Sequence, residues 1–419
     1  MKTNTRFSQY LRESKHSETL HVNQLSLSRA ANNQNVYKFG FGQSPFPVPD
    51  EITKELSKAA YRKEYMSVQG HQPLRAAIVD FHKEKEGKDW FAENIVVGAG
   101  SKILLFCVMA SFKQAEIILP APSWVSYEPQ GKLAGHKVSW LNTTFDDKWH
   151  LTPKQLDDYC SSRNKPEIPL ILVLNYPSNP TGQTYNKAEL SALSEVMRKH
   201  NVIVIADEIY SLLTFEKSYA SIADFYPEGC IVSSGLSKWC GAGGWRLGFI
   251  YIPPQLGDLL STVIGVASET YSCAPSPIQI AATKAYSASN ITDNFLTKQI
   301  EILSEISTYC TKALTDINIK VHVAEGGFYL FPDFSYYAVK LNNRGICTSE
   351  QLTSALMEET GIALLPGSAF GMKDTSLTTR LAFVDFDGSQ IFNDNNAEFE
   401  YEKVKTGMTL LCKWLSVLE

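Results

Sequence analysis

Short apolar runs of four to six residues recur through the first two thirds of the chain, with longer helical stretches between them. Each run is continuously apolar instead of alternating with polar residues, which is typical of strands buried on both faces. Such strands in alternation with helices predict a three-layer α/β fold, with a mainly parallel sheet and helices on both faces. The expected strands cover residues 116–119, 136–140, 169–174, 202–206, 230–233 and 247–252.

The length of 419 residues exceeds what one ordinary hydrophobic core organises, so a second, smaller unit is expected. The region after about residue 320 differs in composition from the strand-rich part and contains its own short strands and a helix from Ser349. We interpret this region as part of a smaller α+β domain that closes on the larger one.

Charge and composition point to a small-molecule partner. The formal net charge is -5 and the pI is near 6.0, which disfavours nucleic acid and anionic membranes as partners. The eight cysteines lie far apart and the eight histidines have no paired spacing, so neither disulfides nor a metal site is predicted. No apolar run reaches the length of a membrane span and the first residues lack a secretory pattern, so we predict a soluble, cytoplasmic protein.

Residues 94–106 read as a strand, a tight turn and an apolar helix. The turn at Gly100 and Ser101 places free backbone N–H groups at the positive end of a helix, where an anion such as phosphate fits. A dinucleotide fold would need a small residue where the chain has Ile103, and no G-x-x-x-x-G-K-[ST] loop occurs. The turn therefore predicts a phosphate site of another kind.

Polar residues follow two of the expected strands. Asp207 and Glu208 come directly after the strand that ends at Ala206, and Tyr210 follows them. A carboxylate at the rim of a buried sheet is costly unless a cation or a protonated nitrogen pairs with it, so Asp207 needs a positive partner. The strand before residue 175 runs into N-Y-P-S-N-P-T-G, where the prolines either aim Asn179 at a fixed point or simply make a turn.

The stretch 233–248 sets Lys238 after a short apolar strand, then a glycine-rich bend, then Arg246 eight positions later. Burial and a cationic neighbour both disfavour the ammonium form and free the amine for carbonyl chemistry. This arrangement suits a Schiff-base lysine, although a lone lysine is more often a solvated surface group.

Five of these features stand in an order and spacing that resembles the fold-type I aminotransferases of class I/II, which use pyridoxal 5′-phosphate (PLP). They are Gly100-Ser101 before a helix, Asn179 in N-P-T-G, Asp207 with Tyr210, Lys238, and Arg246. The resemblance covers the chain from about Tyr37 to the C-terminus. It implies an enzyme of amino acid metabolism that moves an amino group from an α-amino acid to a 2-oxo acid, through a Schiff base on Lys238.

The resemblance also implies roles around the cofactor ring. Lys238 would bond the cofactor's aldehyde and then shuttle the proton at the substrate α-carbon. Asp207 would keep the pyridine nitrogen protonated, and Asn179 and Tyr210 would hydrogen-bond the phenolate oxygen. Trp124 would stack on the ring face, where the alternative is an ordinary core tryptophan.

The same resemblance implies a phosphate site and a homodimer. Tyr65 resembles the tyrosine that reaches the phosphate from the neighbouring subunit, so the active site would be shared between two copies. The remaining phosphate contacts would come from backbone groups at Gly100, Ser101 and Lys102, from Ser237, and from the guanidinium of Arg246.

On the substrate side, Arg380 resembles the arginine that clamps the α-carboxylate, and Gly42 the glycine whose amide contacts it, with Asn179 beside them. The identity of the amino acid stays open. An acidic substrate would need a second arginine, and apolar walls are indicated by Phe41, Tyr127 and Phe328.

One position departs from the family pattern. Family members often carry a hydroxyl residue three positions before the lysine, where this chain has Gly235. Ser237, Ser234 or Ser233 would substitute, or one phosphate contact is missing. The runner-up functions are a PLP-dependent carbon–sulfur β-lyase or another PLP reaction, and a PLP-binding protein without turnover.

The resemblance sets the expected domain boundaries. We predict an N-terminal arm over residues 1–35 and a large PLP-binding domain over 63–295. The small domain would be built from both ends of the chain, from residues 36–62 and 296–419.

Overall fold

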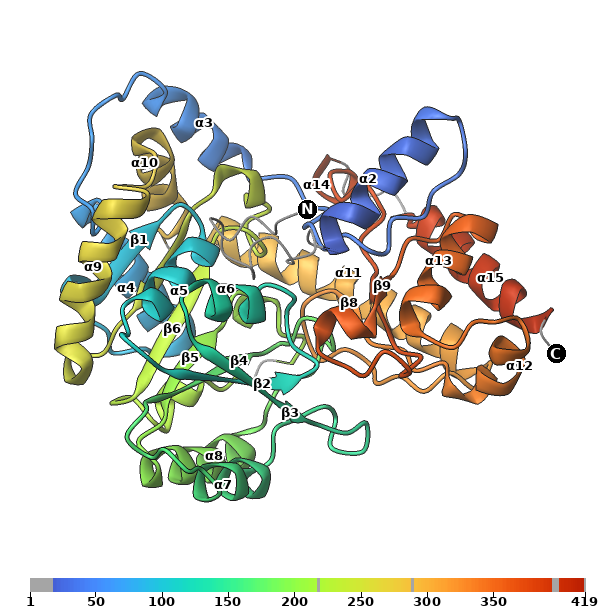
Figure 1. Ribbon diagram of the computed structural model, residues 1–419. Coiled ribbons are helices and arrows are strands. Elements are labelled where there is room, and N and C mark those ends of the chain that lie inside the picture. The colour runs from blue at the N-terminus through green and yellow to red at the C-terminus, as the bar shows by residue number, and fades with distance from the viewer. Residues whose placement is uncertain (1–17, 217–218, 288–289, 394–398, 418–419) are drawn as a thin grey trace, which may run out of the picture.

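The computed structural model describes residues 18–216, 219–287, 290–393 and 399–417, so the first half of the predicted arm lies outside the described residues. Its central element is a seven-stranded sheet in the order β1-β7-β6-β5-β4-β2-β3 (Figure 1). The strands are β1 (Ile95–Gly98), β2 (Glu116–Ala121), β3 (Lys137–Asn142), β4 (Leu170–Asn175), β5 (Ile203–Asp207), β6 (Cys230–Gly235) and β7 (Gly248–Tyr251).

The sheet is mainly parallel, which confirms the predicted fold class. Strands β2 to β6 pair in parallel, and β7 runs antiparallel to both of its neighbours, β1 and β6. Burial on both faces holds for β1, β2, β6 and β7, but the prediction is wrong for β3. Strand β3 is half-exposed and lies at one edge of the sheet, with only β2 beside it.

Helices cover both faces because successive strand residues point to opposite sides. On β2, for example, Ile117 packs into one core and Ile118 into the other. The core with Ile117 is closed by α5 (Ser101–Ala110), α6 (Tyr127–Leu133) and α9 (Gly257–Thr270). The core with Ile118 is closed by α4 (Gln72–Glu86), α7 (Pro153–Ser161) and α8 (Lys187–Lys199), and α10 (Ser276–Ala285) packs against both α4 and α3 (Asp50–Ala59).

A second, three-stranded antiparallel sheet of order β8-β10-β9 lies in the C-terminal part. Its strands are β8 (Tyr329–Leu330), β9 (Leu365–Pro366) and β10 (Thr379–Ala382), and the helices are α12 (Ala338–Asn343), α13 (Ser349–Thr360), α14 (Gln390–Asn393) and α15 (Glu402–Ser416). The long helix α11 (Asn290–Thr315) runs between this part and the large sheet (Figure 1).

The first described residues pack against this smaller part. Tyr37 bridges to Ile362, and the N-terminal helix α2 (Glu18–Ala31) packs beside β9 (Figure 1). The predicted boundary between residues 295 and 296 falls inside α11, and the domain division stays a prediction. Among the helices of the described ranges, none is long and apolar enough to cross a membrane.

Candidate active site

A cavity of about 420 Å³ opens where the carboxyl ends of β4 and β5 meet the N-terminus of α5. The carboxyl edge of a parallel sheet is where such folds bind ligands. Residues from the three-stranded sheet close the cavity from the other side. Eleven of the predicted site residues line it: Gly42, Ser101, Lys102, Trp124, Asn179, Asp207, Tyr210, Ser237, Lys238, Arg246 and Arg380.

The two strand ends are fixed to each other by a side chain that sequence reasoning missed. Asn175, the last residue of β4, is paired in register with Asp207 and donates from Nδ2 to its carbonyl oxygen at 2.7 Å. Its Oδ1 accepts the backbone N–H of Asn179 at 2.7 Å. Asn175 therefore sets the loop that presents Asn179, and its position at a strand end, like that of Asp207, was the available signal.

Asp207 is 3% exposed, and its two carboxylate oxygens differ in their hydrogen bonding. Tyr127 donates a hydrogen bond of 2.7 Å to Oδ2, while Oδ1 is buried without a hydrogen-bond partner. Burial raises the pKa of Asp207 to about 6, although Tyr127, the N–H of Ile209 and the charge of Lys238 oppose the rise. The cavity thus presents an unpaired acceptor that a protonated nitrogen would satisfy.

Lys238 reaches into the same cavity from the loop after β6. Its Nζ donates to the carbonyl oxygen of Gly42 at 2.8 Å and lies 5.5 Å from the ring centre of Tyr210. Desolvation lowers the pKa of Lys238, and the charges of Arg380 and Arg246 act in the same direction, against Tyr329 and Asp207. A lysine in this environment reaches the neutral, nucleophilic form more readily than a surface lysine.

An anion cup forms at the N-terminus of α5. Gly100, at the N-cap, has a φ of 92°, and a Cβ there would lie 2.2 Å from Nη2 of Arg246. A Cβ on Gly248 would lie 2.3 Å from the backbone nitrogen of Ser101. Only glycines let the guanidinium and the helix N–H groups converge this closely, which is the donor set that a phosphate needs. Gly100 thus shapes the cup without itself lining the cavity.

Steric crowding explains why position 235 is a glycine. A Cβ on Gly235 would lie 2.8 Å from both the Cα of Gly248 and the carbonyl oxygen of Leu247, where β6 meets β7. A hydroxyl residue therefore does not fit at this position without a backbone shift. Of the three serines considered as substitutes, Ser237 lines the cavity, whereas Ser233 and Ser234 are buried outside it.

Arg380 projects from β10 and is 2% exposed. Its Nη1 donates to Oδ1 of Asn179 at 3.0 Å and its Nη2 to the carbonyl oxygen of Gly40 at 2.7 Å, while Nε is buried without a partner. The guanidinium also lies 4.6 Å from the ring centre of Tyr329. These contacts fix the guanidinium plane at the cavity wall, ready for a carboxylate.

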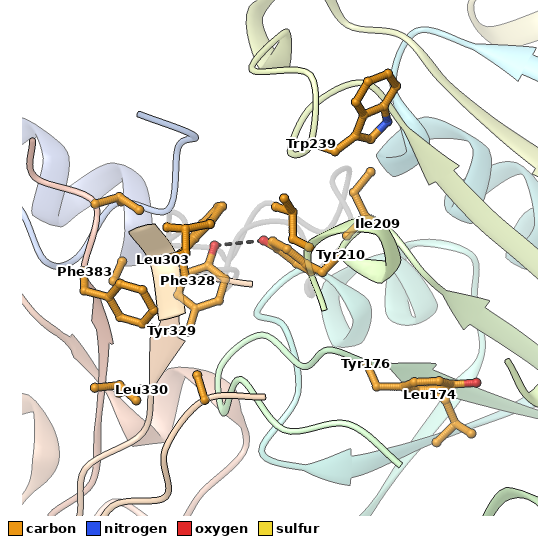
Figure 2. Packing of buried hydrophobic residues seen from close by; sticks show 14 of the residues in the cluster. Leu174, Tyr176, Ile209, Tyr210, Trp239, Leu303, Phe328, Tyr329, Leu330 and Phe383 are labelled. Atoms are coloured by element: carbon orange, nitrogen blue, oxygen red, sulfur yellow. Dashed lines mark hydrogen bonds between the residues drawn. The ribbon is translucent and has the colours of Figure 1, made fainter. Parts of the chain in front are cut away.

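Tyr329 is a second residue that sequence reasoning missed, although it directly follows Phe328, which was expected as an apolar wall. Its hydroxyl lies 3.0 Å from the hydroxyl of Tyr210, and Figure 2 shows the two rings meeting from opposite sides, one after β5 and one on β8. A Cβ on Gly42 would lie 1.9 Å from the Tyr329 hydroxyl, so the glycine leaves room for this contact.

Of the three aromatic residues expected as apolar walls, Phe41 and Tyr127 line the cavity, and the hydroxyl of Tyr127 is engaged by Asp207. Phe328 is buried and does not line it. Tyr65 is 92% exposed and lies outside the cavity of this chain.

Comparison with known proteins identifies the family. The profile of the family described as aminotransferase class I and II matches residues 33–386. The chain therefore belongs to the class I and II aminotransferases. This aminotransferase is a PLP-dependent transaminase, which confirms the predicted cofactor and the reaction of an α-amino acid with a 2-oxo acid.

Its relatives bear related names. The chain is 31% identical over 370 residues to the aspartate/prephenate aminotransferase of Cereibacter sphaeroides, covering 85% of this chain and 90% of the relative. It is 29% identical over 368 residues to the aspartate aminotransferase of a Bacillus species, covering 86% and 90% of the two chains. The fold matches that of Thermus thermophilus aspartate aminotransferase with maleate, with a TM-score of 0.84, 22% identity and coverage of 97% and 99%.

The residues of the cavity fit PLP. The anion cup at Gly100, Ser101 and Arg246 suits the phosphate, and the unpaired Oδ1 of Asp207 suits a protonated ring nitrogen. Lys238 supplies an amine of lowered pKa between them. In the described residues, no group of three or more His, Cys, Asp or Glu side chains is placed to hold a metal ion.

Proposed function

We propose that this aminotransferase uses Lys238 as its catalytic lysine and Arg380 as its carboxylate clamp. The observation that carries the proposal is that both side chains enter one cavity beside the partnerless oxygen of Asp207. When bound, PLP supplies an aldehyde that takes up the amino group and a ring that spreads negative charge. The protein supplies the rest of the chemistry.

Each residue has a task in this proposal. Arg380 binds the α-carboxylate of the amino acid and of the 2-oxo acid, which orients the α-carbon toward Lys238. Lys238 takes the α-proton with its amine and returns a proton to the cofactor side. Asp207 holds the proton on the ring nitrogen, and Asn179 and Tyr210 hydrogen-bond the ring's phenolate oxygen.

The phosphate end is proposed to involve the backbone of Gly100, Ser101 and Lys102 with the side chains of Ser237 and Arg246. We propose that Trp124 stacks on the ring, since it lines the cavity and packs edge-on against Tyr127 at 5.2 Å. These contacts would hold the cofactor in one orientation, with Lys238 available to its aldehyde.

A screen of half-reactions with single amino acids tests the proposal. The holoenzyme is mixed with one amino acid at a time, beginning with aspartate because the named relatives use it. Loss of the cofactor's visible absorption and formation of pyridoxamine phosphate are expected with the native donor. A Lys238→Ala variant with full activity would end the proposal, and release of ammonia without pyridoxamine phosphate would favour the β-lyase.

We also propose a homodimer with shared active sites. The exposed Tyr65 lies outside the cavity of its own chain, as expected for a residue that serves the other copy. Mixing inactive Lys238→Ala and Tyr65→Ala chains tests this idea, because hybrid dimers would hold one intact site. Random mixing should restore about a quarter of the wild-type sites, whereas hybrids without activity would contradict sharing.

The compartment is proposed to be cytoplasmic. Eight cysteines without a pairing pattern suit a reducing environment. Cell fractionation with an antibody to the chain tests this assignment, and recovery outside the cytosol would contradict it.

A further inference from the structure

Glu208 is a buried carboxylate for which the proposed chemistry has no use. It follows Asp207 directly, is 2% exposed and does not line the cavity. Its carboxylate accepts a hydrogen bond of 2.5 Å from the hydroxyl of Ser221, and its backbone N–H donates to the carbonyl oxygen of Ser233 at 2.8 Å. Asp207 therefore faces the cofactor site while its neighbour is anchored behind it.

Ser221 links Glu208 to charged groups of two other elements, since its backbone N–H donates to Oδ2 of Asp224 at 3.2 Å. Lys88, just after α4, has a side chain that is 3% exposed, and its Nζ donates to Oδ1 of Asp224 at 2.6 Å. Its charge attracts Glu208 and Glu86 as well as Asp224, and these attractions raise the pKa of Lys88 against the effect of burial. We name Glu86, Lys88, Glu208 and Asp224 the back cluster.

Among the described residues, the other titratable neighbours of the back cluster are His82, Tyr176, Tyr219 and Cys230. Nδ1 of His82 lies 2.6 Å from Oε2 of Glu86. Burial raises the pKa of Tyr176, Tyr219 and Cys230, and the charge of Glu208 raises it further, so these three stay neutral. Lys88 is thus the cation whose charge favours the ionised form of Glu208.

The back cluster holds the turn that carries two proposed catalytic groups. The carbonyl oxygen of Glu208 accepts the N–H of Ser211 at 3.0 Å, and that of Tyr210 accepts the N–H of Leu213 at 2.8 Å. Asp207 and Tyr210 line the cavity from this turn. Because a buried carboxylate needs its partners in fixed places, the hydrogen bond from Ser221 to Glu208, and through Ser221 the pair of Asp224 and Lys88, restrict the turn.

We propose that Glu208 and Lys88 are positioning residues, which hold Asp207 and Tyr210 in place for PLP and thereby support the transamination proposed above. Neither residue lines the cavity. They act through the turn at residues 207–211, in the way that residues outside a binding site orient those that line it.

The proposal predicts a dependence on pH near neutrality. Burial raises the pKa of Glu208 to about 7, with Glu86 and Asp224 adding to the rise and Lys88 and Ser221 opposing it. Below this pH Glu208 is protonated and its attraction to Lys88 is lost. Cofactor affinity should therefore fall as the pH drops from 8 to 6, and this component should be absent from Glu208→Gln.

Four variants test the proposal by PLP affinity of the cofactor-free protein and by steady-state kinetics at pH 8. Glu208→Gln keeps an acceptor for Ser221, Lys88→Met removes the cation, and the third variant combines the two. The matched control is Lys85→Met, since Lys85 lies on α4 but pairs with the half-exposed Asp293.

Glu208→Gln and Lys88→Met should each weaken PLP binding and lower kcat by about tenfold, as expected when groups that orient a site are removed. The KM for the amino acid should stay within about twofold because Arg380 is untouched. The combined variant should lose no more than either single one, since both changes remove the same attraction. Lys85→Met should resemble the wild type.

Chemical denaturation of the cofactor-free proteins separates positioning from simple stability. Glu208→Gln should unfold no more easily than the wild type, because it no longer buries a carboxylate. Wild-type affinity and kcat in Glu208→Gln, additive losses in the combined variant, or equal losses in Lys85→Met would each overturn the inference. If one of these results is found while Lys238→Ala is inactive, only the positioning role of Glu208 and Lys88 is refuted. If Lys238→Ala is active, the proposed function itself is refuted.

Discussion

Tyr127 donates a 2.7 Å hydrogen bond to one carboxylate oxygen of Asp207 and leaves the other oxygen without a partner in the buried wall of the cavity. The hydroxyl of Tyr127 orients the carboxylate, so the free oxygen is set in place before a ligand arrives. Burial meanwhile raises the pKa of Asp207 to about 6. In the cofactor-free protein the buried carboxylate of Asp207 therefore lowers the free energy of unfolding. A protonated ring nitrogen would remove this destabilisation.

Asp207→Asn should stabilise the cofactor-free protein at neutral pH. The folded protein holds the Asp207 proton more tightly than the unfolded chain, with a pKa of about 6 against 3.8. The free energy of unfolding should therefore fall as the pH rises from about 4 to 6 and then level off. Asp207→Asn does not lose unfolding free energy over this pH range, so it should be more stable than the wild type by up to about 3 kcal/mol at pH 7.5.

Denaturant unfolding of both cofactor-free proteins at pH 4 and pH 7.5 measures this difference. It should shrink toward zero at pH 4, where Asp207 is protonated. PLP affinity should fall in the variant, because asparagine does not carry the charge that holds the ring proton. A stability difference that does not change with pH would contradict the assignment.

Gly100→Ala should weaken cofactor binding through Arg246. The added Cβ would lie 2.2 Å from Nη2, so the guanidinium has to leave the anion cup. The loss of charge-assisted hydrogen bonds should lower PLP affinity by about 10- to 100-fold. Gly87→Ala is the matched control, with a φ of 68° and open space around the new methyl group, and should cost only about 1 kcal/mol of stability.

Gly235→Ser should destabilise the protein without improving cofactor binding. Its side chain would press on Gly248 and on the carbonyl oxygen of Leu247, at a cost of about 1–3 kcal/mol. Ser237→Ala should do the opposite, with weaker PLP binding at unchanged stability. Thermal unfolding and PLP titration of both variants measure the pair of effects, and tighter PLP binding by Gly235→Ser would refute this explanation.

Arg380→Gln should impair both substrates while the cofactor stays bound. Removing the cation from a buried carboxylate contact should lower kcat/KM by about 100-fold for the amino acid and for the 2-oxo acid. The visible absorption of the cofactor should persist. Arg344→Gln, at a half-exposed arginine paired with Glu359, is the control and should keep wild-type kinetics. Equal losses in both variants would argue against a specific clamp.

The strand pattern predicted the fold because buried parallel strands leave a clear signal. It also predicted where site residues would gather, since Asp207 and Asn179 follow strands whose ends share one edge. The prediction that β3 is buried on both faces was wrong, because the place of a strand in a sheet depends on pairing between distant segments.

The missed parts of the site are contacts across long stretches of chain. Tyr127 was interpreted as an apolar wall, since an aromatic residue in a sequence does not show which atom its hydroxyl meets 80 positions away. The exclusion of a side chain at Gly235 depends on how closely β6 approaches β7. Glu208 was noted only as the neighbour of Asp207, and its separate environment requires the positions of α4 and Asp224.

Borohydride reduction followed by peptide mass mapping tests the central claim, that Lys238 is the lysine that bonds the cofactor. Reduction converts a lysine–cofactor linkage into a stable amine, which adds the mass of the cofactor to one peptide. The mass should appear on the peptide that contains Lys238, and Lys238→Ala should yield no labelled peptide. A label on Lys102 or any other lysine, with Lys238 unmodified, would contradict the account.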